Sequence, residues 1–347
     1  MSAEIANELS EKYTIWYVSY SRDIESHLNN SIKFVKTNVK SCLTIFGLGS
    51  YSIFDIVKLY ILFKRIQPDL VIICQGTIEV GLKGMWASKL CRYKTISYIP
   101  LCYSFSEIKS FMGCWRDIIA SYYYRVFDAI ITISGEQKEL LSHRVDKKVY
   151  ILNNAVDGKC DNGYLSPLKK DEPVVIGIIG RISFVQKGQN KIIGIANKVK
   201  SLKINVIFRI IGDGEDADNM RASIRANGLD KMIYVDNWEK DRRILYKGIN
   251  IVLITSNYEG VPLVMLESIL FGKYVIAPNM GIFKEYLDKD FLYNSINDAA
   301  GIICRVIENY NEYRYKFDKS YRLVIENNNR ETFRSNLFSI IDEITSN

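Results

Sequence analysis

Short apolar runs rich in β-branched residues alternate with longer helical patterns along almost all of the 347-residue chain. Such alternation is typical of α/β proteins, in which helices connect parallel strands and cover the sheet. Strands are predicted in the first half at Tyr13–Tyr20, Asp69–Gly76, Lys94–Leu101, Ala129–Ser134 and Lys147–Asp157. They are predicted in the second half at Val174–Gly180, Lys203–Gly214, Met232–Asn237, Asn250–Ser256 and Lys273–Pro278. The pattern therefore predicts two doubly wound domains whose strand-end loops face a central cleft.

Composition places the domain boundaries. A stretch rich in Gly, Pro, Asp and Lys interrupts the alternation, and we expect a linker at 161–172. The first domain then spans 1–160 and the second 173–325. A charged helix is expected at 326–347, in a position to cross back to the first domain.

The net charge of +7 favours anionic partners such as phosphates or a lipid surface, but only weakly. Basic residues form no repeated cluster, which argues against nucleic-acid binding. Two histidines and seven scattered cysteines leave little material for a metal site or a disulfide framework. The amino end lacks the pattern of a signal peptide, and no uncharged run approaches the ~18 residues of a bilayer span. We therefore expect a soluble or peripheral cytoplasmic protein.

Two glutamates stand eight residues apart in the stretch NYEGVPLVMLE, which runs from Asn257 to Glu267. Pro262 suits the first turn of a helix, so Glu259 is predicted in the preceding loop and Glu267 well inside the helix. Amides around Gly260 to Val264 would form a positive helix terminus suited to a diphosphate. A glutamate on each side of this terminus is suited to accept hydrogen bonds from sugar or ribose hydroxyls.

This stretch resembles the E-x7-E motif of glycosyltransferase family 4, whose members are retaining enzymes with the two-domain GT-B fold. Three other segments support the resemblance. Ile176–Ile193 is similar to the family's strand with its Gly-Arg and Lys-Gly segments, and Ile210–Asp216 is similar to its Gly-x-Gly turn. The region from Ala129 to Asp157 resembles the end of the acceptor domain and the turn into the hinge. The resemblance thus spans nearly the whole chain and implies two Rossmann-like domains.

The resemblance also implies roles for individual residues. Arg181 and Lys187 would hold the donor diphosphate, and with Glu259 they would be the catalytic residues. Glu259 would contact the donor sugar and Glu267 the ribose. The implied donor-binding set is Arg181, Lys187, Glu259, Gly260, Val261, Pro262, Leu263 and Glu267. The charge of the leaving diphosphate would be stabilised by these groups without a metal ion or cofactor.

The implied function is transfer of a hexosyl or N-acetylhexosaminyl group from a UDP- or GDP-linked sugar. The acceptor would be a glycan or lipid-linked molecule of bacterial-type surface polysaccharide or glycolipid assembly. An alternative is a catalytically silent nucleotide-sugar binding protein or partner subunit with an incomplete first domain. A sugar-nucleotide epimerase of the same fold is disfavoured by the scarcity of histidine and by the E-x7-E spacing.

An aromatic segment, Tyr103–Phe127, combines aromatic side chains with Lys109, Arg116 and Arg125. It is predicted either to meet the headgroups of an anionic membrane, on the inner face of the cell membrane, or to form a core helix. Ile118 and Ile119 extend the apolar pattern and support the core interpretation.

Two features depart from the family pattern. The first strand and its glycine-rich turn are missing before Met1, where MSAEIANELSEKY resembles the helix that follows them. Ile15–Val18 and Leu70–Cys74 are expected to pair with this strand, with Ile15–Val18 buried on both faces. We therefore expect the natural gene product to carry roughly 15–20 further residues before Met1. Near Tyr98–Pro100 no counterpart of the family's histidine stands, so no catalytic histidine is assigned.

Overall fold

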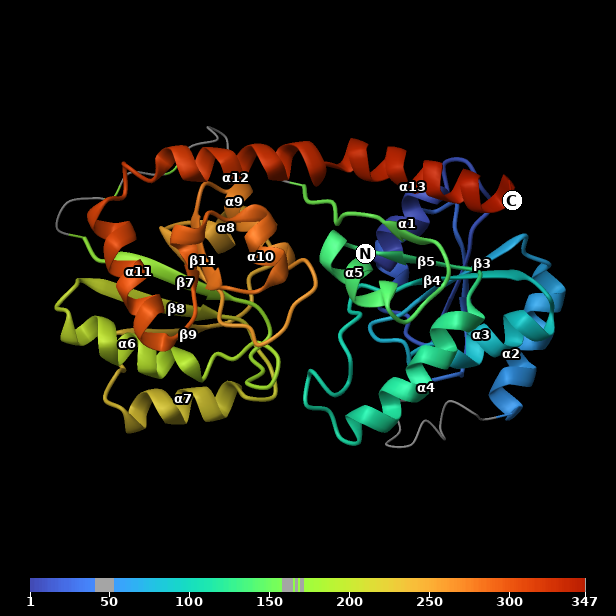
Figure 1. The fold of residues 1–347 in the computed structure, drawn as a ribbon, viewed down its shortest axis with the longest axis horizontal. Helices are drawn as coiled ribbons and strands as arrows, with labels where there is room; N and C mark the ends of the chain where they lie inside the picture. Colours follow the sequence, from blue (N-terminus) through green and yellow to red (C-terminus); the bar gives the residue numbers. More distant parts are fainter. Residues whose placement is uncertain (41–52, 158–164, 166–167, 169–171, 347) are drawn as a thin grey trace. The chain divides into compact units, whose positions relative to one another are not determined.

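The computed structural model describes residues 1–40, 53–157, 165, 168 and 172–346. The chain forms two compact units (Figure 1). Unit 1 comprises Met1–Asn154 and Glu331–Asn347, and unit 2 comprises Ala155–Arg330. The expected linker at 161–172 falls almost entirely outside the described residues.

Unit 2 contains a parallel sheet with the strand order β12-β11-β10-β7-β8-β9. Its strands are β7 (Val174–Ile179), β8 (Val206–Ile211), β9 (Ile233–Asp236), β10 (Ile251–Leu253), β11 (Tyr274–Pro278) and β12 (Leu292–Tyr293). The central strand β7 is almost wholly apolar and mostly buried, as expected of a strand covered on both faces. Chain direction thus brings all the strand-end loops to one edge of the sheet.

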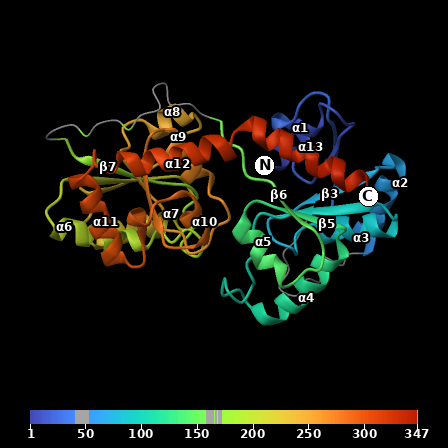
Figure 2. The ribbon, with the colours of Figure 1, turned by 45° about the horizontal axis from the view of Figure 1, so that its top comes forward.

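Helices lie on both sides of this sheet (Figures 1 and 2). They are α6 (Lys191–Ser201), α7 (Ala217–Ala226), α8 (Arg242–Tyr246), α9 (Leu263–Leu270), α10 (Gly281–Tyr286), α11 (Ile296–Glu308) and α12 (Arg314–Asn327). Helix α6 packs beside α11, and α9 packs beside α12. Helix α11 is capped by Ser295, whose side chain accepts a hydrogen bond from the amide of Asp298.

Unit 1 contains a parallel sheet of order β3-β4-β5-β6 and a separate parallel pair, β1-β2. The strands are β1 (Trp16–Ser19), β2 (Lys33–Lys36), β3 (Leu70–Cys74), β4 (Lys94–Tyr98), β5 (Ala129–Thr132) and β6 (Val149–Ile151). The helices are α1 (Ser2–Leu9), α2 (Ile53–Ile66), α3 (Leu82–Leu90), α4 (Gly113–Val126), α5 (Gly135–Ser142) and α13 (Arg330–Ser346). Ion pairs attach α13 to the amino-terminal region: Lys12 pairs with Asp342, and Arg334 pairs with Glu8 and Glu11.

The core of unit 1 lies between its four-stranded sheet and helices α3, α4 and α5. Its largest fully buried side chains include Tyr124, Phe127 and Met85. Helix α5 begins where Ser134 accepts a hydrogen bond from the amide of Gln137. Apolar strands and helix caps therefore account for the α/β architecture that the sequence predicts.

The structure corrects three expectations. Strand β1 is not buried on both faces, because Trp16 is 41% exposed and the rest of the strand is half-buried. Strand β2 was not predicted, because its sequence KFVK is short and begins and ends with lysine. Helix α9 begins at Leu263, so Pro262 is the capping residue before the helix and not part of its first turn.

Helix α4 has one buried face and one exposed face. Ala120, Tyr123 and Tyr124 are buried. Ile118 and Ile119 are exposed, which contradicts the core interpretation for those two residues. The same outer side of the segment exposes large apolar side chains, which we call the α4 apolar stripe: Phe111, Trp115, Ile118, Ile119 and Tyr122.

Candidate functional site

Three loops meet at the carboxyl edge of the unit 2 sheet, and glycines allow their close approach. Gly212, after β8, has a φ of +154°, and a Cβ there would lie 2.1 Å from the carbonyl oxygen of Gly180, after β7. Gly188 has a φ of +62°, and its Cβ would lie 2.4 Å from the carbonyl oxygen of Thr255, after β10. Larger side chains would collide with backbone at both positions, so the sequence needs glycine to bring these loops together.

Hydrogen bonds connect the same loops. The Thr255 hydroxyl donates to the carbonyl oxygen of Lys187 at 2.8 Å. The amide of Asn257 donates to the carbonyl oxygen of Gln186 at 2.8 Å. Lys191 donates to the carbonyl oxygen of Thr255 at 2.9 Å, and burial lowers the pKa of its ammonium group. The loop after β7 is therefore fixed against the loop after β10.

Lys187 and Glu259 meet in this arrangement, although they are 72 residues apart in sequence. The Nζ atom of Lys187 donates to Oε1 of Glu259 at 2.5 Å. The Ser256 hydroxyl donates to the same oxygen at 2.6 Å. The Glu259 side chain is 7% exposed and that of Lys187 is 27% exposed. Among the described residues, Oε2 of Glu259 has no such partner, so it is available to accept another hydrogen bond.

Arg181 stands beside this pair with an exposed side chain. Its Nη2 atom donates to Oε1 of Gln186 at 2.8 Å. Burial raises the pKa of the Tyr258 hydroxyl. The charge of Arg181 lowers this pKa, and the charges of Glu259 and Glu215 raise it. Two of these three charged groups, Arg181 and Glu259, were predicted site residues.

The amino terminus of α9, at Leu263, is separated from Glu259 by three residues. Pro262 caps the helix without a side-chain hydrogen bond, and in the part of the chain that the structure describes no side chain is bonded to the amides of the first turn. Gly260, Val261 and Pro262 are buried, and Leu263 is 40% exposed. A helix terminus of this kind carries partial positive charge and attracts anions.

Glu267 lies one turn into α9 and has its own partners. Its Oε1 atom accepts a hydrogen bond from Nε of Arg242 at 2.9 Å, and its Oε2 atom accepts one from the Tyr246 hydroxyl at 3.2 Å. Burial, and then the nearby Glu267 charge, raise the pKa of Tyr246. Each carboxylate oxygen has two lone pairs, so Glu267 retains acceptor capacity. The hydrogen-bond partners of Glu267 are therefore different from those of Glu259.

Several of these contacts were not predicted from the sequence. Ser256 donates a hydrogen bond to Glu259, and Arg242 and Tyr246 donate hydrogen bonds to Glu267. Tyr258 precedes Glu259 in the chain and feels its charge. Ser256 and Tyr258 lie next to the motif, so their position in the loop was a usable signal. Arg242 and Tyr246 lie on α8, and no sequence pattern links that helix to α9.

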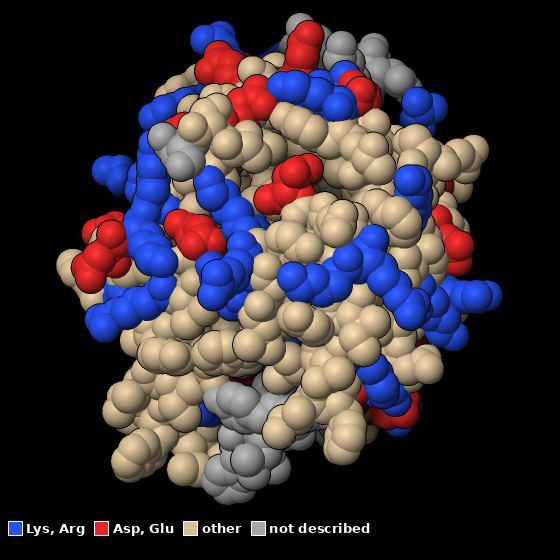
Figure 3. Space-filling view, turned by 90° about the vertical axis from the view of Figure 1, so that its right-hand side faces the viewer, with Lys and Arg blue, Asp and Glu red and all other residues tan. Residues whose placement is uncertain are grey.

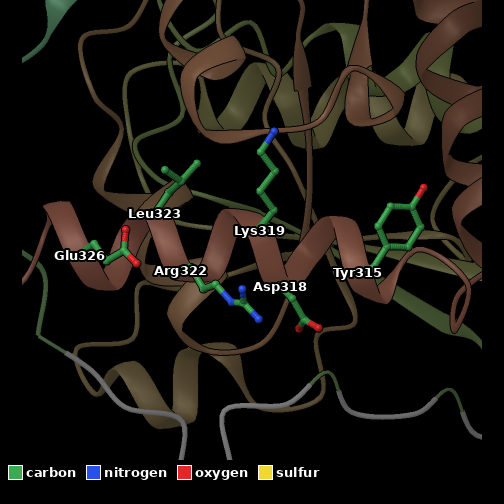
Figure 4. Close-up of a pocket in the computed structure, with 6 residues that line it drawn as sticks. All are labelled: Tyr315, Asp318, Lys319, Arg322, Leu323 and Glu326. Atoms are coloured by element: carbon green, nitrogen blue, oxygen red, sulfur yellow. The ribbon is translucent and has the colours of Figure 1, made fainter.

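Elsewhere, the described chain offers little for a ligand site. Its His, Cys, Asp and Glu side chains form no group of three or more that could hold a metal ion. A hollow of about 330 Å³ is lined by Tyr315, Asp318, Lys319, Arg322, Leu323 and Glu326. Figure 4 shows that these side chains fan out from the single helix α12 and do not converge on one point. Neither Glu259 nor Glu267 lines this hollow, and its side chains do not form an assembled site.

Solved structures define the class of fold. Anabaena HepE in complex with UDP-glucose superposes with a TM-score of 0.76 and 17% identity, covering 99% of this chain and 94% of that chain. The lipopolysaccharide outer core galactosyltransferase WaaB, in its apo form, gives a TM-score of 0.71 and 19% identity, with the same two coverages. Together with the parallel sheets of the two units, these likenesses establish the GT-B fold of glycosyltransferases.

Sequence comparison also finds similarity to glycosyltransferases. Residues 166–323 match the family model "Glycosyl transferases group 1". The lipopolysaccharide 1,6-galactosyltransferase of Salmonella typhimurium is 24% identical over 198 residues, which cover 53% of each chain. The amylovoran biosynthesis glycosyltransferase AmsD of Erwinia amylovora is 22% identical over 234 residues, which cover 66% of this chain and 64% of the relative. The chain thus matches less than two thirds of the length of either relative.

No helix in the described parts of the chain is both long enough and apolar enough to cross a bilayer.

Proposed function

We propose that this protein is a retaining, metal-independent glycosyltransferase. It transfers a hexosyl or N-acetylhexosaminyl group from a nucleoside-diphosphate sugar to a glycan or lipid-linked acceptor in surface polysaccharide or glycolipid assembly. The observation that carries the proposal is the Lys187–Glu259 pair, held at 2.5 Å, with Glu259 separated from the amino terminus of α9 by three residues. Support comes from the family match over 166–323 and from relatives named for lipopolysaccharide and amylovoran synthesis.

Diphosphate stabilisation is the first task of the site. Negative charge builds up on the diphosphate as the bond from the sugar to its phosphate breaks. Lys187 has three N–H donors, of which one is used by Glu259, and Arg181 has donors beyond the one that meets Gln186. Together with the first-turn amides of α9, these groups stabilise the leaving diphosphate electrostatically.

Sugar orientation is the task assigned to Glu259. Lys187 and Ser256 hold its Oε1, which leaves Oε2 to accept a hydrogen bond from a hydroxyl of the donor sugar. A carboxylate so fixed loses little conformational entropy when the sugar binds. Glu267, one turn after the start of α9, would accept hydrogen bonds from the ribose. Arg242 and Tyr246 fix the orientation of its carboxylate.

UDP is the proposed nucleotide, because the solved neighbour HepE was crystallised with UDP-glucose. Thermal-shift and calorimetric titrations with UDP, GDP and their sugars test this choice. Incubation of the matching donor with candidate acceptors, followed by NMR of the product, tests transfer and retention together. An inverted anomeric centre in the product contradicts the proposed mechanism, and GDP-selective binding contradicts the proposed nucleotide.

The alternative, a silent nucleotide-sugar binding protein, makes a different prediction in the same experiments. It binds the donor but neither transfers nor hydrolyses the sugar with any acceptor. Glu259→Gln separates the two proposals further, since it lowers turnover in an enzyme and has no turnover to lower in a binding protein.

We also propose that the protein works at the cytoplasmic face of an anionic membrane and meets it through the α4 apolar stripe. Phe111 and Trp115 are 66% and 65% exposed. Lys109 and Arg125 are exposed on the same segment. Figure 3 shows Lys and Arg side chains in bands across one end of unit 1, above a lower region that is mostly uncharged. Aromatic side chains flanked by cations suit the boundary between headgroups and acyl chains.

Co-sedimentation with vesicles of mixed anionic and neutral lipids tests this surface. We expect binding that weakens at high salt, because salt screens the attraction of the cations. Replacement of both Phe111 and Trp115 by serine should abolish binding at unchanged thermal stability. Tyr315→Ser, which changes an aromatic residue of unit 2 that is 69% exposed, is the matched control and should bind as the wild type does. Equal binding by all three proteins rules out the α4 surface.

A further inference from the structure

Trp238 stands in the loop at the carboxyl end of β9, two positions after Asp236, the last residue of that strand. The carbonyl oxygen of Asp236 accepts a hydrogen bond from the amide of Gly212 at 3.1 Å, so the loop leaves the sheet beside the loop after β8. Trp238 is 44% exposed. A single exposed aromatic side chain is common at a protein surface, so its surroundings decide what it can do.

Arg242 connects Trp238 with Glu267. The Cζ atom of Arg242 lies 5.6 Å from the centre of the Trp238 ring. The Nε atom of the same guanidinium group donates to Oε1 of Glu267 at 2.9 Å. The described part of unit 2 also exposes the aromatic side chains of Tyr234 and Tyr315, and neither of them contacts a partner of a predicted glutamate. Trp238 is therefore linked to the candidate site through one side chain.

The loop after β9 and the helix that follows it are fixed in place. The amide of Asp241 donates to Oε1 of Glu239 at 2.8 Å, and the Asp241 side chain caps the start of α8. The ring of Tyr246, near the end of α8, stacks on that of Phe271 with 4.8 Å between the ring centres. The indole of Trp238 is therefore carried by a preformed loop, and a ligand that binds to it need not order the backbone first.

The order of groups in a nucleoside diphosphate places the base. The ribose joins the base to the diphosphate, so the base lies beyond the ribose when the ligand is followed from its phosphates. The proposed function puts the diphosphate at Lys187 and the ribose at Glu267. From Glu267, the hydrogen bond of Arg242 leads to Trp238. A nucleobase is a flat π system that stacks on aromatic side chains and on guanidinium planes.

We propose that Trp238 is the stacking platform for the base of the donor nucleotide. The proposal rests on the proposed function, because it takes the ribose position at Glu267 from it. The base lies on the exposed part of the indole, which makes Trp238 a residue that sets nucleotide affinity. The Nη atoms of Arg242 make no hydrogen bond among the described residues, so they are available to a carbonyl oxygen of the same base.

Calorimetry with UDP on the 347-residue protein tests the platform. Trp238→Ala should weaken UDP binding by about 5- to 150-fold, the range of base–aromatic stacking. Trp238→Phe keeps a ring, whereas Trp238→Leu keeps only apolar bulk beside Arg242. The phenylalanine variant should therefore bind UDP about 2- to 12-fold more tightly than the leucine variant. Tyr234→Ala, which changes an aromatic residue of β9 that is also 44% exposed, is the matched control and should bind UDP as the wild type does.

Indole fluorescence supplies a readout that a loss of packing would not reproduce. A base stacked on Trp238 changes the emission of its indole. UDP should therefore change the emission of the wild type and of Tyr234→Ala, and Trp238→Phe should lose this change although calorimetry shows that it still binds UDP.

The outcomes separate this inference from the proposed function. Equal UDP affinity of the wild type and Trp238→Ala, or of the phenylalanine and leucine variants, would overturn the stacking role while the donor site stands. An emission change that persists in Trp238→Phe would overturn it too. A wild-type protein that binds no nucleotide would overturn the proposed function and this inference together.

Discussion

Replacement of Lys187 by alanine tests the centre of the proposed donor site. Lys187 is 27% exposed and donates at 2.5 Å to Glu259, which is 7% exposed. If its remaining donors bind the diphosphate, the variant loses a charge-assisted hydrogen bond of about 1.5–3 kcal/mol. UDP affinity should then fall by about 10- to 150-fold.

Loss of the lysine has a second consequence, because it leaves the Glu259 carboxylate buried without its cation. The negative charge then repels the diphosphate. Glu259→Gln added to Lys187→Ala should therefore restore part of the UDP affinity, although it removes a group from the sugar site. The pair also stabilises the fold, so Lys187→Ala should lower the free energy of unfolding by about 1–3 kcal/mol. The double variant should lose less than the sum of the two single losses.

Calorimetry with UDP and urea denaturation of all four proteins measure these quantities. Lys191→Ala is the matched control, since it removes the same charge from the same loop region. Lys191 contacts only the neutral oxygens of Thr255 and Asn257 among the described hydrogen bonds. UDP affinity in Lys187→Ala equal to that in Lys191→Ala would refute a specific contact between Lys187 and the diphosphate.

Three further predictions concern other parts of the chain. Glu267→Gln should weaken the binding of free UDP by about 1 kcal/mol or more, because the ribose loses an acceptor. Equal calorimetric affinity of the wild type and the variant for UDP would contradict this role of Glu267. Gly212→Ala should lower the free energy of unfolding by roughly 1–3 kcal/mol, because its Cβ would lie 2.1 Å from the carbonyl oxygen of Gly180; an unchanged urea midpoint would contradict this. The hydrogen bond from Lys83 lowers the pKa of Asp55, so this carboxylate stabilises unit 1 above its unfolded pKa of about 3.9. This contribution disappears as the pH falls through the lower folded pKa, so the stability difference between wild type and Asp55→Asn should shrink with acidification and not stay constant.

Strands were predicted well wherever burial on both faces makes the sequence almost continuously apolar. Val174–Ile179 and Tyr274–Pro278 are of this kind, and both stand within the predicted ranges. Prediction failed at Lys33–Lys36, since a four-residue strand with charged ends has no periodicity to detect. It also failed for the burial of Trp16, which is 41% exposed on a strand that pairs only with β2 in the described chain.

Side-chain partners were less predictable than the elements that carry them. The E-x7-E spacing indicated where the glutamates stand, but not what holds them. Lys187 reaches Glu259 only because the loops after β7 and β10 leave adjacent strands of one sheet. Arg242 reaches Glu267 from a helix of five residues, whose position is set by packing and not by any local pattern. Tertiary contacts of this kind require the sheet order as well as the sequence.

The spacing of the two glutamates has a structural explanation in α9. Glu259 lies in the loop before the helix and Glu267 lies one turn into it, with the first-turn amides between them. A nucleoside-diphosphate sugar has the same order of groups: sugar hydroxyls, two phosphates, then ribose hydroxyls. Lys187 holds the carboxylate of Glu259, and Arg242 holds that of Glu267. Because the helix between them is rigid, the distance between the two acceptors is fixed before any ligand arrives. Under the proposed function, the donor would then meet a preformed row of acceptor, anion site and acceptor, which would lower the entropy cost of binding it.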